Sequence, residues 1–282
     1  MRQIVPLTAI ALAGLLSACT QPAEEQVQEV LGEINVIDET NLNDIMLTVG
    51  DPDEAVTYFA NATAGAPDRI DLRRGLALSL VRAGRPADAV PEWRAVIAMP
   101  GATAADTVEL ADAYIRGNQW DAAAQTLASL PPTYETFNRY RLEAMIADSR
   151  QQWDRADSFY ETAAGLTTQP AATFNNWGFS KLTRGKYAEA EALFLRAIQH
   201  NGNLYAAKNN LILARGAQRD YSLPVIPMTQ IERAQLLHSL ALTAIKQNDI
   251  TIGKSLLSDA ISTHPQHFEE AVRALEALDN NA

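Results

Sequence analysis

The sequence predicts an all-α fold in which about six similar units follow one another. Small residues recur at a fixed place in these units: Ala55, Ala89, Ala123, Ala156 and Ala190. Their spacings are 34, 34, 33 and 34 residues. A large apolar residue follows each alanine four positions later, and a small or apolar residue follows seven positions later. This spacing places the side chains on one face of a helix.

The 34-residue period with this pattern resembles the tetratricopeptide repeat (TPR). The resemblance implies two antiparallel helices per unit, which cross closely at the alanine. It also implies a right-handed superhelical solenoid of about six helix pairs. Placing each alanine at the twentieth position of its unit gives the starts Val36, Ile70, Ala104, Phe137 and Ala171.

The first two units contain clear helix-start signals. Asp51 is a good N-cap for a helix that begins at Pro52. In the second unit, Gly84 and Pro86 mark a turn and the start of the second helix. A proline is tolerated there because the first turn of a helix leaves its N–H groups unpaired.

The next three units are supported unequally. Gly117 and Trp120 support the third unit, and Tyr160 supports the fourth. The fifth unit matches the pattern best, because Trp177 and Gly178 form the large-then-small pair expected in its first helix. Gly178 lets the neighbouring helix approach closely. Gly185 can take the positive φ of a tight helix-ending turn.

The pattern then breaks. Residues 204–218 read as another first helix, but no second helix follows, because Pro224 and Pro227 bar a continuous helix. We therefore expect one interrupted pair and an irregular stretch over 219–233.

A final pair starts near Ala234, and residues 267–278 form a C-terminal capping helix in this interpretation. A solenoid needs such a helix to cover its last apolar face. The predicted TPR solenoid spans residues 36–279.

The N-terminus resembles that of a bacterial lipoprotein. After Arg2 an apolar run reaches Leu16, which predicts a signal peptide over residues 1–18. The run ends in Leu-Ser-Ala-Cys, a lipobox-like sequence, with the chain's one cysteine at Cys19. The resemblance implies acylation of Cys19, and several acyl chains anchor a protein stably. The alternatives are an accidental cysteine after a signal peptide or a buried core cysteine. Residues 19–35 are predicted to be a flexible acidic tether.

Composition excludes several classes of partner and chemistry. The formal net charge of −11 argues against nucleic acid and against polybasic attachment to anionic lipid. The sequence contains no catalytic or phosphate-binding motif, so we expect no enzyme activity and no cofactor. His264 and His267 read as loop or capping residues rather than as metal ligands. The tryptophans at helical positions read as core residues: Trp93, Trp120, Trp153 and Trp177.

The TPR resemblance implies a concave groove lined by the first helix of each unit. The groove positions are occupied by Arg74, Arg82, Arg116, Arg141, Asn175, Asn176, Phe179, Asn209 and Asn210. Asparagine amides can donate to and accept from a peptide backbone. Arginines can bind a partner carboxylate through two parallel hydrogen bonds. The alternative is that these polar residues are merely solvated.

A lipobox, an acidic tether and about six TPR units together resemble the TadD lipoproteins of tight-adherence (Flp) pilus assembly. This resemblance implies a non-enzymatic scaffold, anchored by lipid to the periplasmic face of the outer membrane. Its partners would be envelope or pilus-assembly proteins, the secretin or its associates. The alternatives are a pilotin or β-barrel assembly lipoprotein of another envelope machine, and an activator of a cell-wall enzyme.

Overall fold

The computed structural model describes residues 42–280. Over this range the chain contains helices and their connections, and no strand. The described residues divide into two compact units, one up to Ala83 and one from Gly84 onwards, which we describe separately. The predicted signal peptide (1–18) and the predicted tether with Cys19 (19–35) lie outside the described residues. Within the described range the predicted all-α fold is confirmed.

The first unit contains a short helix over residues 42–48, followed by α2 (Pro52–Gly65) and α3 (Ile70–Arg82). The carboxylate of Asp51 accepts hydrogen bonds from the N–H groups of Asp53 (2.9 Å) and Glu54 (3.1 Å), so it caps α2 as predicted. On α2, Ala55 is fully buried, as its place in the repeat predicts.

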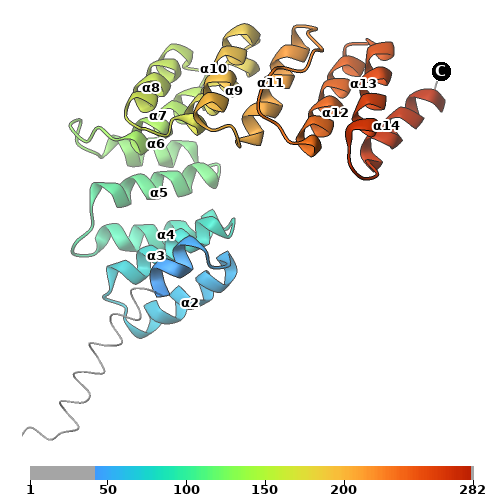
Figure 1. Cartoon of the computed structure of the whole chain (residues 1–282). Helices are drawn as coiled ribbons and strands as arrows, with labels where there is room; N and C mark the ends of the chain where they lie inside the picture. Colours follow the sequence, from blue (N-terminus) through green and yellow to red (C-terminus); the bar gives the residue numbers. More distant parts are fainter. Residues whose placement is uncertain (1–41, 281–282) are drawn as a thin grey trace, which may run out of the picture. The chain divides into compact units, whose positions relative to one another are not determined.

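The second unit consists of helices that pack in chain order (Figure 1). They are α4 (Pro86–Ala98), α5 (Ala104–Arg116), α6 (Trp120–Ala128), α7 (Phe137–Ser149), α8 (Trp153–Gly165), α9 (Ala171–Thr183), α10 (Tyr187–His200), α11 (Tyr205–Ala217), α12 (Gln230–Lys246), α13 (Ile250–Thr263) and α14 (Glu269–Asn280). Across both units, α3, α5, α7 and α9 begin at the residues predicted as repeat starts.

The recurring alanines belong to the buried core. Ala89, Ala123, Ala156 and Ala190 in the second unit have no exposed surface. The large residues four positions later are also buried, among them Trp93 and Phe194. A larger side chain in place of a buried alanine would overpack the core, so the repeat pattern reflects a packing requirement.

The turns between the helices of a pair share one backbone device. Five of them contain a residue with positive φ, one position before the N-cap of the next helix: Gly84, Asn118, Gln151, Gly185 and Asn248. The prediction for Gly185 is confirmed, with φ of 73°. Arg219 takes the same conformation after α11, although no helix begins directly after it, since α12 starts only at Gln230. The first helix of the interrupted pair therefore ends like the others.

Proline explains why the sixth pair lacks its second helix. Leu223 precedes Pro224 and is thereby biased away from helical geometry, and Pro227 blocks a later start. The irregular segment still covers apolar surface. Tyr221, Leu223 and Met228 pack against the core formed by α12, α13 and α14. Ile226, in the same segment, packs against the core around α9, α10 and α11.

The helix after this segment begins earlier than the predicted Ala234. It starts at Gln230, because Thr229 and Glu232 form a capping box. The Thr229 N–H donates to the Glu232 carboxylate (2.7 Å), and the Glu232 N–H donates to Thr229 Oγ1 (3.1 Å). The closing helix α14 runs over Glu269–Asn280, two residues later than predicted.

Candidate partner-binding groove

A groove of about 500 Å³ runs across the first helices of the fourth to sixth pairs. Its lining comes from α7, α9 and α11, with aromatic residues contributed by α6 and α8. The lining residues are Trp120, Met145, Asp148, Ser149, Trp153, Tyr160, Asn175, Asn176, Phe179, Ser180, Thr183 and Asn210. The groove therefore combines aromatic walls with amide and hydroxyl groups.

Four of the predicted groove residues meet in this groove: Asn175, Asn176, Phe179 and Asn210. Asn209 faces a neighbouring hollow of about 580 Å³ between α11 and α12. There its Oδ1 accepts a hydrogen bond from the Ser239 hydroxyl (2.9 Å).

The amides of the groove differ in what they can offer a ligand. Asn210 Nδ2 donates to Asn175 Oδ1 over 3.0 Å, which joins α11 to α9. One donor of Asn210 and one acceptor position of Asn175 are therefore already used. Among residues 42–280, no side-chain hydrogen bond engages Asn176, so its amide can both donate and accept. Phe179 lies beside it on α9, with half of its surface exposed.

The predicted arginines point to groups of the chain itself. Arg116 and Arg141 both pair with the buried Asp112, the latter over 3.0 Å. In the first unit, Arg82 donates to the carbonyl oxygens of Met46 (2.8 Å) and Gly50 (2.9 Å). Arg74 lies on α3 in that same unit. Because Arg82, Arg116 and Arg141 serve internal contacts, we do not include the arginines in the candidate site, and their predicted role stays a prediction.

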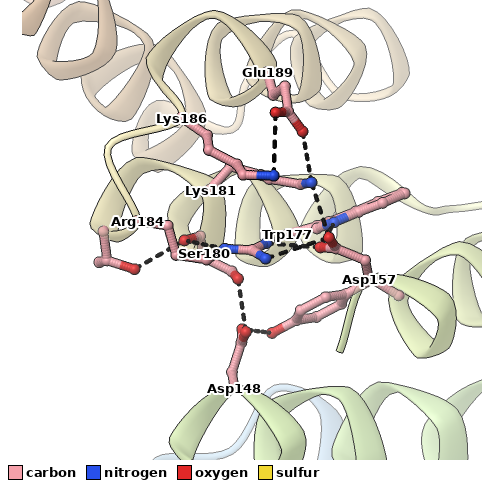
Figure 2. A network of polar contacts seen from close by, with 10 residues as sticks. Asp148, Asp157, Trp177, Ser180, Lys181, Arg184, Lys186 and Glu189 are labelled. Carbon is pink, nitrogen blue, oxygen red and sulfur yellow. Dashed lines mark hydrogen bonds and ion pairs between the residues drawn. The ribbon is translucent and has the colours of Figure 1, made fainter. Parts of the chain in front are cut away.

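Asp148 joins three helices at the groove. Its carboxylate accepts hydrogen bonds from the Tyr160 hydroxyl (2.9 Å) and the Ser180 hydroxyl (2.6 Å) (Figure 2). Burial raises the pKa of Asp148 above its ordinary value, although the two hydroxyl donors act in the opposite direction. Burial likewise raises the pKa of Tyr160, which therefore stays a neutral donor.

A second carboxylate, Asp157, binds α8 to α9. It accepts from Trp177 Nε1 (2.7 Å), Lys181 Nζ (2.9 Å) and Arg184 Nη2 (2.7 Å) (Figure 2). Burial would raise the pKa of Asp157, but these donors outweigh it and lower the pKa to about 2. Lys181 also pairs with Glu189 on α10 over 2.6 Å. The network fixes the position of α9, which carries Asn175, Asn176 and Phe179.

Two tryptophans contradict their sequence-based interpretation as core residues. Trp93 is buried as predicted, with 1% of its surface exposed. Trp120 and Trp153 are only half-buried and line the groove. Each is the first residue of a second helix, directly after the turn. The recurrence of tryptophan at the start of the second helix in consecutive helix pairs was the signal that could have identified them.

The described residues contain neither a group of side chains that could bind a metal ion nor a helix that could span a membrane. Between residues 42 and 280, no three His, Cys, Asp or Glu side chains gather as a metal site would require. His264 is the C-cap residue of α13, as its capping interpretation predicts. Within the same range, no helix combines the length and apolar character needed to span a bilayer.

Comparisons with known proteins agree with this architecture. A tetratricopeptide-repeat family model matches residues 47–93 and 74–134. The Cut9–Hcn1 hetero-tetramer of the APC/C is similar, with 12% identity and a TM-score of 0.59 over 84% of this chain. This chain spans about half (48%) of the length of that one.

Two bacterial structures resemble the chain as well. A TPR protein of Thermus thermophilus has 16% identity and a TM-score of 0.54, with 62% of this chain and 95% of that chain covered. A tetratricopeptide repeat protein of Parabacteroides merdae has 13% identity and a TM-score of 0.53, with 84% and 96% covered. At these identities the likeness shows the fold alone. No curated protein sequence matches the chain.

Proposed function

We propose that this chain, part of which matches a tetratricopeptide-repeat family model, is a non-enzymatic scaffold that binds an extended segment of a partner protein. The observation that carries the proposal is the groove lined by Asn176, Phe179 and Asn210 on successive first helices. Binding sites of this kind combine apolar walls with a few polar groups that fix orientation.

The two kinds of lining group have different roles in this proposal. The Asn176 amide can donate to a backbone carbonyl and accept from a backbone N–H, so it recognises an extended chain independently of its sequence. The aromatic residues Trp120, Trp153 and Phe179 can contact the side chains of the bound segment. Affinity then resides in a few central residues.

The cellular setting of the proposal rests on sequence resemblance. The lipobox-like ending at Cys19 and the acidic stretch after it support a lipid-anchored protein at the periplasmic face of the outer membrane. Together with the repeats, they support a role in tight-adherence pilus assembly. The partner would then be the secretin or a protein that assembles with it.

Paired variants of the full chain test this proposal. Asn176→Ala with Phe179→Ala removes a free amide and an exposed ring, so the fold should persist. We expect recovery of the secretin by crosslinking in envelopes to fall to background. Ile252→Ala is the control, because Ile252 is an exposed apolar residue on α13, away from the groove lining. Undiminished recovery with the double variant, at unchanged helix content by circular dichroism, would refute binding in this groove.

A further inference from the structure

The groove is lined almost entirely by uncharged residues. Of the residues that line it, Asp148 alone carries a formal charge. No lysine or arginine is among the lining residues, so the groove offers no group that would select a carboxylate of the partner. The rest of the lining is aromatic, aliphatic, amide or hydroxyl.

Asp148 also differs from several other shielded carboxylates of the second unit, which are ion-paired. Asp112 pairs with two arginines, and Asp157 pairs with Lys181 and Arg184. Glu143 pairs with Arg139, and Glu232 pairs with Lys208. Within the described part of the chain, Asp148 has hydroxyl donors and no ion-pair partner. A half-buried carboxylate without a cation is costly, and a cation from outside would relieve that cost.

The nearby Arg184 does not supply this cation. It attracts Asp148 electrostatically. Its guanidinium, however, donates to Asp157 through Nη2 (2.7 Å) and to the Ser180 carbonyl oxygen through Nε (3.2 Å). Each carboxylate oxygen has two acceptor positions, and the hydroxyl donors occupy one on each oxygen of Asp148. Among the described residues no further side chain donates to Asp148, which leaves acceptor positions for a donor that enters the groove.

We propose that the bound segment is basic, and that one of its lysine or arginine side chains pairs with Asp148. The stem of such a side chain can lie along the aromatic walls formed by Trp120, Trp153 and Phe179. Its head group can also gain cation–π attraction from Trp120 or Phe179, since Arg184 of the chain itself already lies over the Trp153 ring (5.1 Å). A basic segment also complements the net charge of −11. This inference rests on the proposed function, because it specifies what the same groove binds.

A single substitution separates charge from structure at this site. Asp148→Asn removes the charge, but an amide can still accept from one hydroxyl and donate to the other. The ties to Tyr160 and Ser180 can therefore persist. Ser180→Ala is the matched control, because it removes one of these ties and keeps the carboxylate. Circular dichroism melts of both variants show whether the fold is retained.

The probe is a phage-displayed library of random 12-residue peptides, selected on the full chain. We expect the selected peptides to share a lysine or arginine. Changing that residue to glutamine in a synthetic peptide should weaken binding by at least about tenfold. Asp148→Asn should cause a similar loss and should abolish the difference between the two peptides. Ser180→Ala should leave that difference in place.

Two results would overturn the inference. Selected peptides without a shared basic residue would refute it while leaving groove binding intact, provided that Asn176→Ala with Phe179→Ala abolishes their binding. A preference for the basic peptide that survives Asp148→Asn would also refute it. If the chain enriches no peptide beyond the level of the double groove variant, the proposed function fails together with the inference.

Discussion

The ring of Phe194 on α10 occupies the space that a side chain on Gly178 of α9 would need. A Cβ at Gly178 would lie 2.7 Å from Phe194 Cε1, which is closer than carbon atoms can approach. Phe194 has no exposed surface, so it has little room to move. The predicted close approach at Gly178 is thus confirmed, and it holds the two helices of the fifth pair together.

Gly178→Ala should therefore destabilise the protein by roughly 1–3 kcal/mol, because the added methyl group overpacks this contact. The loss should outweigh the gain of about 1 kcal/mol in helix propensity. Gly165→Ala on α8 is the control, because a Cβ there meets nothing within 4 Å. Urea denaturation of both variants measures the difference. Equal midpoints would contradict the packing at Gly178.

The carboxylate of Asp157 should make stability sensitive to acid. Its pKa is about 2 in the folded protein, below the ordinary value of 3.8, so the unfolded chain binds this proton more readily. The stabilisation is present above about pH 4 and is lost as the pH falls from 4 towards 2. Asp157→Asn should cost roughly 1.5–3 kcal/mol at neutral pH and should reduce the loss of stability in the acid window.

Thermal melts between pH 2 and 7 provide the measurement for this prediction. Glu161→Gln is the control, because Glu161 is exposed on the same helix, α8. It should melt like the native protein throughout. If Asp157→Asn and the native protein lost stability in parallel below pH 4, the donors around Asp157 would not be the cause.

Lys208 and Glu232 form a shielded ion pair between α11 and α12 over 2.9 Å, with 2% of the Lys208 side chain exposed. Glu232→Gln should destabilise the protein by roughly 3 kcal/mol, because it leaves a buried charge unpaired. Glutamine can preserve the capping box with Thr229, so the change isolates the charge. Adding Lys208→Met should recover most of the loss, since it replaces the unpaired charge with apolar packing.

Denaturant midpoints of the single and double variants decide this third prediction. A double variant that is no more stable than Glu232→Gln alone would mean that the loss comes from the helix cap. The single change Lys208→Met serves as the reference, and we expect a smaller loss than for Glu232→Gln, because the Glu232 carboxylate keeps its hydrogen bond from the Thr229 N–H.

Cys19→Ser should abolish lipid attachment, because the lipid is joined through a thioether and Cys19 carries the only thiol of the sequence. Metabolic labelling with an alkyne fatty acid is the measurement. Thr20→Ala keeps the thiol and should retain the label. Equal labelling of Cys19→Ser and the native chain would disprove the lipoprotein proposal.

Local signals predicted the helices well. The starts of α3, α5, α7 and α9 could be predicted because the repeat period and the turn residues act within a few positions of each helix end. The start of α12 was also readable, since Thr229 and Glu232 have the spacing of a capping box. The repeat register, with Gly253 at the alanine position, predicted the later start at Ala234.

The groove was only partly predictable. Repeat positions identified Asn175, Asn176, Phe179 and Asn210, because equivalent positions of stacked units face the same side. They did not identify Asp148, whose place in the groove depends on hydrogen bonds to hydroxyls 12 and 32 residues away. Nor did they distinguish Trp153 in the groove from Trp93 in the core.

The sequence by itself determined the helix pairs and their contact residues, because a 34-residue period combined with helical spacing leaves one face of each helix to be buried. Only the tertiary structure decided which polar side chains remain available to a partner. Arg141 and Asp112 stand 29 residues apart in the chain, yet they form an ion pair that the repeat pattern did not indicate. Such pairing depends on the distance between side chains of different helices, and that distance is set when the helices pack.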